Sequence, residues 1–474
     1  MGDKERLFEV SLVREGAYRS ISAALEAVER CVPDETVPVR VLVAPGEYRE
    51  RVEIRRSHVT IEGETADSVR IVGDLGAKMP SGDGSGLDGM LGTFRTYTML
   101  VDADDVTLAN LTIENDAGNG REVGQAIALY ADGDRLVVDA CRILGHQDTL
   151  FAGPLPPREV KPGGFIGPKQ FAPRRVGRQY YRRCLIAGDV DFIFGGACAY
   201  FEGCEIRSLN RDMDVNGYVT AASTPEGEPC GFVFHGCSFT ADEGIAPGSV
   251  YLGRPWRNWA QTVLIDCWLG DHIAPEGWWD WNKPAAHDTT LYAGGTLFGP
   301  AGDTAAWVPW AHRLSKQDAE RYAREHVLAG ADDWDPEDGA GDAVETAELS
   351  ANGRTVHIET YYEDEPALRT RLKREGRKAA FTGKTPADFE AWRVATRARL
   401  YDVLGLSLMD RAPIEVRELS RVRVAGGIVR THALLQVERD VWMPFYLLEP
   451  SCPKLDERGL KRCYICPHGH QGAG

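Results

Sequence analysis

Five cysteines between residues 141 and 267 occupy the same local frame, and this repetition constrains the fold more than any other feature of the chain. Each follows an apolar run and usually precedes another apolar residue. They lie 43, 20, 33 and 30 residues apart, as Cys141, Cys184, Cys204, Cys237 and Cys267. Short β-prone runs at variable spacing, with few helical patterns between them, are typical of a parallel β-helix rather than of alternating strands and helices. We therefore predict an all-β region in which these cysteines stack inward as small buried hydrophobes.

The β-prone runs extend from about residue 38 to residue 270. Examples are residues 39–43, 59–61, 106–113, 126–130, 190–194 and 232–234. A helical pattern over residues 22–30 is expected to cap one end of the stack, because an uncovered edge of a solenoid invites aggregation. A second helical pattern over residues 316–328 is expected to close the region.

The length of 474 residues favours two domains. We predict a β-helix over residues 1–335, an acidic Gly/Ala-rich linker over residues 336–355, and a second domain over residues 356–474. In the second domain, residues 386–403 have a helical pattern. Strand-like runs follow around residues 416–424, 428–437 and 442–448.

Charge and hydropathy exclude several classes of function. The formal net charge of −17 disfavours nucleic acid as a partner, because nucleic-acid binders need a basic surface. No run approaches 18 apolar residues, and the first residues lead into no apolar stretch, so we expect neither a membrane span nor a secretory signal. A cytoplasmic location is expected. The eleven cysteines are then expected to be reduced and mostly buried.

Two aspartates stand at the same offset within neighbouring repeats. Asp148 lies seven residues after Cys141, and Asp191 lies seven residues after Cys184. If each repeat is one coil, the two carboxylates are one rung apart, roughly 5 Å by the spacing of strands in a sheet. Burial and mutual repulsion would separate their pKa values, so that one stays ionised and the other keeps a proton. Such a pair suits hydrolysis, which needs a nucleophile or activated water and an acid for the leaving group.

Five blocks, in order along the chain, resemble the signature segments of pectin methylesterases. They are Gly46–Glu50, Gly124–Leu129, Gly145–Phe151, Gly188–Gly195 and Leu252–Trp256. The resemblance spans roughly residues 8–335 and implies a right-handed parallel β-helix. The long segment between the two aspartates, which includes residues 163–171, is similar to an extended loop of bacterial members. Loops of that length are usually functional, so we expect it to form a wall of the cleft.

The family resemblance implies a role for each candidate residue. Asp191 would be the nucleophile, and Asp148 the acid that protonates methanol and then the base for water. Arg254 would hold Asp191 ionised. Gln125 and Gln147 would donate hydrogen bonds to the oxyanion.

Trp256 would stack on a sugar ring, and Thr93 matches a substrate-contacting position, although the spacing around it departs from the family. Plainer readings remain open for several of these residues. The aspartates could serve local turns, Arg254 could form a structural ion pair, and Trp256 could pack in the core. The cluster Trp278, Trp279 and Trp281 could line a sugar groove, but packing is the favoured reading.

No cofactor and no metal are expected. Residues 84–89 satisfy G-x-G-x-x-G, but no strand leads into them and no helix follows, which disfavours a dinucleotide site. Cys463 and Cys466, with His468 and His470, have metal-like spacing but no second ligand pair. The expected partner is a methyl-esterified galacturonan or its oligomers, with no nucleic acid and no membrane, and the protein is expected to be a monomer.

Residues 356–474 resemble the leading part of an α/β-hydrolase of the acetyl-esterase or dienelactone-hydrolase kind. The similarity rests on residues 441–450 and 463–472, which look like a strand and the His-Gly loop that supplies oxyanion donors. The sequence contains no G-x-S-x-G motif, so the segment is expected to be an incomplete hydrolase.

The favoured function is hydrolysis of methyl esters of galacturonosyl residues. One alternative is another β-helix enzyme acting on the same polymer, a polygalacturonase or a pectate lyase. A glycosidase would also use paired carboxylates, whereas a lyase would need a cation site and a basic residue as its base. A non-catalytic carbohydrate-binding module is a third class. Release of methanol separates the esterase from all three.

Overall fold

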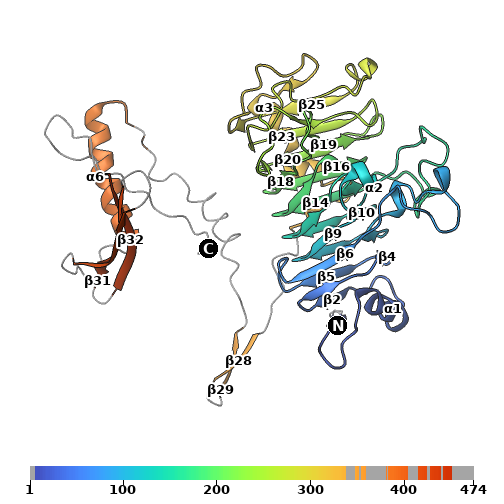
Figure 1. Ribbon diagram of the computed structural model, residues 1–474, viewed down its shortest axis with the longest axis horizontal. Helices are drawn as coiled ribbons and strands as arrows, with labels where there is room; N and C mark the ends of the chain where they lie inside the picture. The colour runs from blue at the N-terminus through green and yellow to red at the C-terminus, as the bar shows by residue number, and fades with distance from the viewer. Residues whose placement is uncertain are drawn as a thin grey trace. The chain divides into compact units, whose positions relative to one another are not determined.

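Three parallel sheets wind around one core in the first part of the chain (Figure 1). The computed structural model describes residues 6–337, 347–351, 354–358, 381, 383–403, 415–423, 428–438 and 441–450. The chain divides into two compact units, residues 1–343 and 344–474. Each unit is described by itself.

The first unit is a parallel β-helix, because every strand pairs with the equivalent strand of the next coil. Sheet A has the order β1 (Arg6–Val10), β2 (Val39–Val43), β5 (Val59–Gly63), β8 (Val106–Ala109), β11 (Leu136–Asp139), β14 (Arg178–Arg182), β17 (Cys198–Glu202), β20 (Phe232–His235), β23 (Gln261–Ile265), β25 (Leu291–Gly294) and β27 (His312–Arg313). Sheet B has the order β3 (Gly46–Tyr48), β6 (Val69–Gly73), β9 (Thr112–Asn115), β12 (Arg142–Leu144), β15 (Leu185–Gly188), β18 (Glu205–Ser208), β21 (Ser238–Ala241), β24 (Cys267–Leu269) and β26 (Leu297–Phe298). Sheet C has the order β4 (Val52–Ile54), β7 (Met99–Val101), β10 (Leu129–Ala131), β13 (Leu150–Ala152), β16 (Val190–Gly195), β19 (Gly217–Ala222) and β22 (Val250–Gly253).

The five cysteines form a ladder inside the β-helix, as their shared frame predicted. All five are buried. Each thiol lies against a backbone carbonyl of the preceding coil. For example, Cys184 Sγ is 3.3 Å from Val138 O, and Cys204 Sγ is 3.4 Å from Tyr181 O. The ladder keeps the coils in register, so residues at one offset from the cysteines recur at the same place in each coil.

A helix caps the N-terminal end of the stack. α1 (Ile21–Cys31) begins where the Ser20 side chain accepts a hydrogen bond from the Ala23 N–H, a typical N-cap. Its buried face, which includes Ala24, Leu25 and Val28, joins the core of the β-helix. The helix predicted over residues 22–30 is therefore confirmed.

Two predicted elements are divided in the structure. The run at residues 106–113 forms both β8 and β9, because the chain turns at Asn110, whose φ is +56°. The helix predicted over residues 316–328 is broken into α3 (Lys316–Ala319), η4 (Glu320–Tyr322) and α4 (Arg324–Val327). Ala323 is extended there, and the break lets Arg324 reach Glu202 on sheet A and Glu337.

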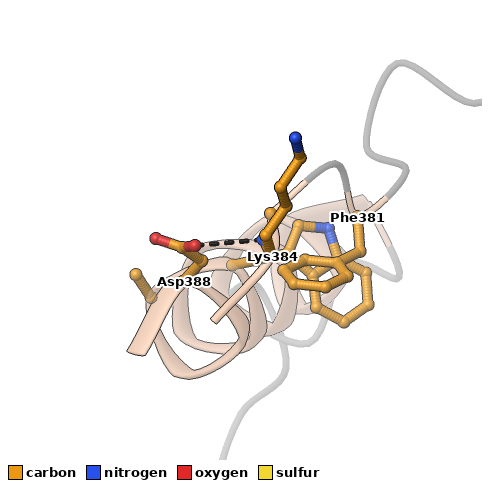
Figure 2. A pocket seen from close by; sticks show the side chains of 6 residues that line it. Phe381, Lys384 and Asp388 are labelled. Atoms are coloured by element: carbon orange, nitrogen blue, oxygen red, sulfur yellow. Dashed lines mark hydrogen bonds between the residues drawn. The ribbon is translucent and has the colours of Figure 1, made fainter. Parts of the chain in front are cut away.

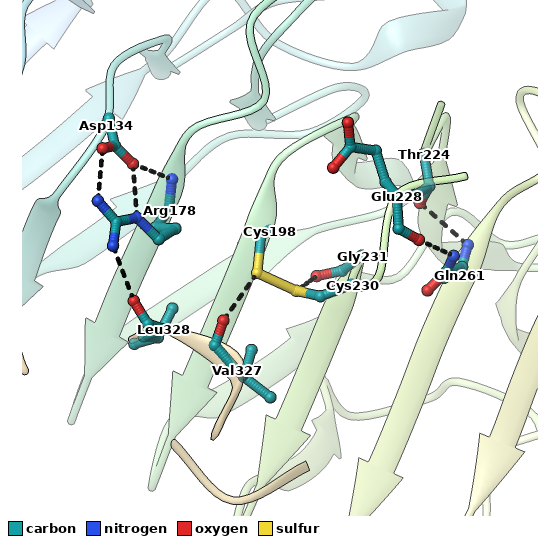
Figure 3. The surroundings of a disulfide bond; sticks show 10 residues. All are labelled: Asp134, Arg178, Cys198, Thr224, Glu228, Cys230, Gly231, Gln261, Val327 and Leu328. Atoms are coloured by element: carbon teal, nitrogen blue, oxygen red, sulfur yellow. Dashed lines mark hydrogen bonds and ion pairs between the residues drawn. A yellow bond between two sulfur atoms is a disulfide. The ribbon is translucent and has the colours of Figure 1, made fainter. Parts of the chain in front are cut away.

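One pair of cysteines is oxidised, so the expectation that all thiols are reduced is wrong for this pair. Cys198 on β17 is joined to Cys230 just before β20 (Figure 3). Cys198 Sγ lies 3.5 Å from Val327 O at the end of α4. Nearby, Arg178 binds the Asp134 carboxylate and the Leu328 carbonyl. The segment after α3 therefore lies along the outer face of sheet A.

The remaining short elements of the first unit are helical. They are η1 (Leu87–Gly89), η2 (Thr93–Arg95), α2 (Gly120–Val123) and η3 (Pro284–Ala286). Residues 84–89 lead into the single turn η1 and not into a long helix, which removes the phosphate-binding geometry of a dinucleotide loop.

The described part of the second unit contains two small antiparallel sheets and one helix. β28 (Ala347–Ala351) pairs with β29 (Arg354–Ile358), so part of the predicted linker forms a hairpin. α6 (Pro386–Val403) is the predicted helix, and β30 (Val416–Arg423), β31 (Val429–Glu438) and β32 (Val441–Glu449) form one sheet. Cys463, Cys466, His468 and His470 lie outside the described residues. No described helix is both long enough and apolar enough to cross a membrane.

Candidate active site

The two aspartates occupy equivalent places on neighbouring coils of sheet C. Leu150 on β13 pairs with Ile193 on β16, so Asp148 and Asp191 each lie two residues before one of these partners. The Asp148 N–H donates to Val190 O at 3.0 Å. Both aspartates have a positive φ, +64° and +50°, which is uncommon outside glycine. The offset that they share in the sequence therefore corresponds to a shared conformation.

A β-bulge sets the direction of the Asp191 side chain. The pairing of β16 with β19 shifts by one residue between Val190 and Ile193, and Asp191 lies within that shift. Bulges occur next to active sites because they redirect a side chain that a regular strand would place elsewhere. Asp191 is 6% exposed and Asp148 is 8% exposed.

Arg254 forms a bidentate ion pair with Asp191. Its Nε and Nη2 atoms each lie 2.7 Å from a different Asp191 oxygen. Arg254 follows β22, two coils beyond β16, and its own N–H donates to Thr220 O on the coil between them. Two parallel charge-assisted hydrogen bonds fix both the charge and the orientation of the carboxylate.

The environments of the two carboxylates separate their protonation states. Burial raises the pKa of Asp148 well above its usual range, and the charge of Asp191 raises it further. Burial also raises the pKa of Asp191, but the Arg254 guanidinium opposes that effect. Asp148 therefore keeps its proton to a higher pH than Asp191 does.

The two glutamines lie on adjacent coils beside the aspartates. The N–H of Ala126, next to Gln125, donates to Gln147 O at 3.0 Å. The Gln147 side chain packs so closely on Gly120, in α2, that a Cβ there would lie 2.6 Å from Gln147 Oε1. Both glutamines are half-buried, which suits donors at the edge of a cleft.

Trp256 joins an aromatic cluster next to the carboxylates. Its half-buried ring stacks on Phe94 with centroids 6.4 Å apart and meets Phe165 edge-on at 6.2 Å. Phe165 belongs to the long loop between β13 and β14, so the loop contacts the candidate sugar-binding residue. Thr93 begins the short helix η2 that carries Phe94 and is half-buried. The Arg257 guanidinium also lies over the Trp256 ring, 5.0 Å from its centroid.

The three tryptophans of the 278–281 cluster separate in the structure. Trp278 is 1% exposed and stacks on Tyr292 in the core, as the packing reading expected. Trp279 stacks on Tyr218, and Trp281 lies over Arg254.

Tyr218 and Asp189, which lie near the carboxylates, were not singled out from the sequence, and Trp281 was considered only for a sugar groove or for packing. The Arg254 guanidinium lies 3.8 Å from the ring centroids of both Tyr218 and Trp281. Asp189 is almost fully buried, and its carboxylate lies 3.0 Å from His146 Nδ1. Tyr218 and Trp281 lie far from Arg254 in the sequence, so their spacing alone does not indicate that they contact it. For Asp189, the short distance from Asp191 in G-D-V-D was a usable signal.

A pocket at the start of α6 has a structural explanation. Asp388 accepts a hydrogen bond from the N–H group of Lys384 (Figure 2). It also accepts one from the N–H group of Thr385, and Phe381 packs on Trp392. This is a helix cap beside a small aromatic cluster. Among the described residues, no group of three or more His, Cys, Asp or Glu side chains could hold a metal ion.

A model of one protein family matches most of the first unit. The model, described as "Pectinesterase", matches residues 9–154 and 174–331 and omits the middle of the long loop. "Probable pectinesterase/pectinesterase inhibitor 23" of Arabidopsis thaliana is 32% identical over 331 residues, covering 68% of this chain and 52% of that protein. The chain spans about half the length of the curated relatives that it matches.

Solved structures share the fold of the first unit. The pectin methylesterase from carrot is 26% identical with a TM-score of 0.55, over 69% of this chain and 93% of that chain. Pectin methylesterase PemA from Erwinia chrysanthemi is 24% identical with a TM-score of 0.56, over 70% of this chain and 98% of that chain, and this likeness concerns the fold alone.

Proposed function

The chain belongs to the pectinesterase family, and from this premise we propose that it hydrolyses methyl esters of galacturonosyl residues in pectin or its oligomers, releasing methanol. One observation carries the proposal: two buried aspartates lie at equivalent positions of adjacent coils, and only one of them is paired with an arginine. A purely structural role does not need two buried carboxylates whose pKa values are driven apart.

The first step is attack by Asp191 on the ester carbonyl. The Arg254 ion pair keeps Asp191 ionised and directs its carboxylate. A bond forms between an Asp191 oxygen and the carbonyl carbon, and negative charge develops on the carbonyl oxygen. Gln125 and Gln147 donate hydrogen bonds to that oxygen. When the tetrahedral intermediate collapses, the proton of Asp148 goes to the departing methoxide, and methanol leaves.

The second step returns the enzyme to its first state. Asp148, now ionised, takes a proton from a water molecule, and the water oxygen attacks the carbonyl carbon of the mixed anhydride. The bond to Asp191 breaks, which gives an ionised Asp191 and a free galacturonic acid, and the acid then loses its proton to solvent. The order of pKa values, with Asp148 above Asp191, is the order that both steps require.

Trp256 and Thr93 would bind the sugar. The half-buried Trp256 ring provides a platform of the kind on which pyranose rings stack. Thr93 directly precedes Phe94, which packs in the same aromatic cluster as Trp256. Trp256→Ala is then expected to raise KM more than it lowers kcat.

Methanol release from methylated oligogalacturonides tests the function. The expected result is methanol in the stoichiometry of new carboxylates, with no shortening of the chain. Shortened chains without methanol would identify a glycosidase. An unsaturated product would identify a lyase, and tight binding without any product would identify a binding module.

We propose further that residues 356–474 correspond to the leading part of an α/β-hydrolase without its own activity. The support is the resemblance of residues 441–450 to an α/β-hydrolase strand and the absence of G-x-S-x-G from the sequence. Hydrolysis of a simple acetyl ester that survives the loss of Asp191 would contradict this assignment.

A further inference from the structure

A conformationally strained turn lies beside the active site. Trp281 and Asn282 both have φ of +55°; asparagine tolerates this left-handed conformation, whereas a bulky tryptophan rarely adopts it, so the strain lies at Trp281. Asp280 holds the turn: its side chain accepts from the Asn282 N–H at 2.9 Å, and its carbonyl accepts from the Lys283 N–H at 3.0 Å. Strain of this kind persists only where the surroundings enforce it, and it gathers at functional sites.

The turn places the Trp281 ring on Arg254. The Arg254 guanidinium is 3.8 Å from the Trp281 centroid and 3.8 Å from the Tyr218 centroid. The guanidinium therefore contacts both aromatic rings at once. Arginine stacks well in this way, and its edge stays free for the two hydrogen bonds to Asp191.

The same turn places the Lys283 amine under the Trp256 backbone. Lys283 Nζ donates to Pro255 O at 2.7 Å and lies 3.3 Å from Trp256 O. It also lies 4.3 Å from the Trp281 ring centroid. Lys283 therefore touches both the ring that holds Arg254 and the backbone that carries Trp256.

Lys283 is a half-buried cation among other charges. The charged groups that act on it are Arg254, Arg257 and Asp191. Burial lowers the pKa of Lys283 to about 8, the two arginines lower it as well, and Asp191 opposes them. Burial raises the pKa of Asp191, Arg254 lowers it most, and the Lys283 charge lowers it as well.

We propose that the turn Asp280–Lys283 is a positioning element of this active site and that Lys283 is its positioning residue. Through Trp281 it fixes the arginine that orients the nucleophile, and through the carbonyls of Pro255 and Trp256 it fixes the sugar-stacking residue. The assignment of these two tasks rests on the proposed function.

The test compares Lys283→Met with Lys316→Met, a control that removes an exposed lysine on α3. The acid-side pKa in the pH profile of kcat/KM reports the ionisation of the nucleophile in the free enzyme. In Lys283→Met it should rise by about half a pH unit or more, a typical effect of losing a nearby charge. KM should rise about five-fold. The control should match the wild type in both.

Two further variants separate positioning from plain stability. Lys283→Arg retains the charge and should restore the acid-side pKa, that is, the acid limb of the pH profile of kcat/KM. Trp281→Phe should retain a higher kcat than Trp281→Leu because it keeps an aromatic face on Arg254. If Lys283→Met lowers Tm but leaves the acid limb and KM unchanged, Lys283 is only structural and the proposal is wrong. If Lys283→Met does not fold, Lys283→Gln, which keeps a donor but no charge, is measured in its place.

A readout without turnover distinguishes this proposal from the proposed function. The ionisation of Asp191 is followed by NMR of its carboxyl carbon, assigned by comparison with Asp191→Asn. An upward shift of that titration in Lys283→Met supports the positioning role even if the wild type releases no methanol, and only the proposed function would then fail. An unchanged titration contradicts the positioning role, whatever the activity.

Discussion

Asp148 and Asp191 share a position in their coils but not an environment, and their chemical roles follow from that difference. Asp191 has a bidentate arginine, whereas Asp148 faces the charge of Asp191. Replacement of either aspartate by asparagine should lower kcat by two orders of magnitude or more, roughly the cost of losing a nucleophile or a general acid. Initial rates of methanol release, with Tm as the check on folding, measure this. Near-normal turnover in one variant would remove that residue from the chemistry.

The raised pKa of Asp148 also has a consequence for stability. Below the pKa of an unfolded aspartate, about 3.9, both states hold the proton and the shift costs nothing. As the pH rises above that value, the unfolded state ionises while folded Asp148 stays protonated, so the free energy of unfolding falls by about 1.4 kcal/mol for each further pH unit until the pH reaches the folded pKa. The loss is complete once the pH passes the folded pKa of Asp148.

Asp148→Asn should therefore be more stable than the wild type at pH 8 and nearly equal to it at pH 3.5. Calorimetric Tm values at the two pH values measure the effect, because asparagine is a neutral residue of the same shape. If the variant is less stable than the wild type at pH 8, burial does not raise the pKa of Asp148 enough to destabilise the folded protein.

At the level of single residues, some of the site could be predicted and some could not. The common offset from Cys141 and Cys184 was sufficient to bring Asp148 and Asp191 together, because a stacked ladder converts sequence offset into position. The partners of Arg254 could not be found in that way. Tyr218 reaches the guanidinium from β19, and Trp281 reaches it from a turn in which its left-handed conformation has no signature in a tryptophan.

At the level of elements, the long loop between β13 and β14 is attached to the site by specific contacts. Lys169 forms an ion pair with Asp102 and lies 3.7 Å from Asp132. Burial raises the pKa of Asp132 to about 6, and Lys169 opposes that effect. The loop is also the part that the family match omits, yet its Phe165 contacts Trp256. Lys169 therefore anchors the loop to Asp102 and Asp132, which follow β7 and β10.

Lys169→Met should therefore weaken substrate binding more than chemistry. Without the anchor, Phe165 no longer holds the Trp256 ring, and we expect KM to rise about three- to ten-fold, or about 1 kcal/mol of binding free energy, while kcat changes about two-fold at most. Lys161→Met is the matched control, since Lys161 is an exposed residue of the same loop. Steady-state kinetics measure both, and equal KM values for the two variants would contradict the anchor.

Strands were easier to predict than the breaks between them. The alternation of buried and half-buried residues over 39–43 and 59–61 is that of a strand, as in β2 and β5. The corner at Asn110 and the break at Ala323 involve contacts far along the chain: the Asn110 N–H donates to Asp139 O on the next coil, and Arg324 reaches Glu202. Local periodicity reports which face of a segment is buried, but it does not report where the next coil makes the chain turn.

At the level of the whole molecule, the end of the first unit is tied back to the middle of the β-helix. Asp332 pairs with Arg178 and with Arg135, and Glu337 pairs with Arg182 and with Arg324. Arg178 is itself paired with the buried Asp134. Several charges in one network stabilise more than isolated surface pairs do, so residues 332–337 belong to the folded β-helix.

This network decides how much of the chain the esterase needs. A chain shortened to residues 1–343 keeps Asp332 and Glu337 and should release methanol with the kcat and KM of the full chain, because no residue of the candidate site lies beyond Trp281 and Lys283. A chain shortened to residues 1–331 removes the partners of four arginines and should have a lower Tm. The residual activity of that shorter chain at low temperature should still depend on Asp191. Methanol assays and melting curves on the three lengths separate these outcomes. Loss of activity on removal of residues 344–474, with Tm unchanged, would mean that the second unit takes part in the reaction.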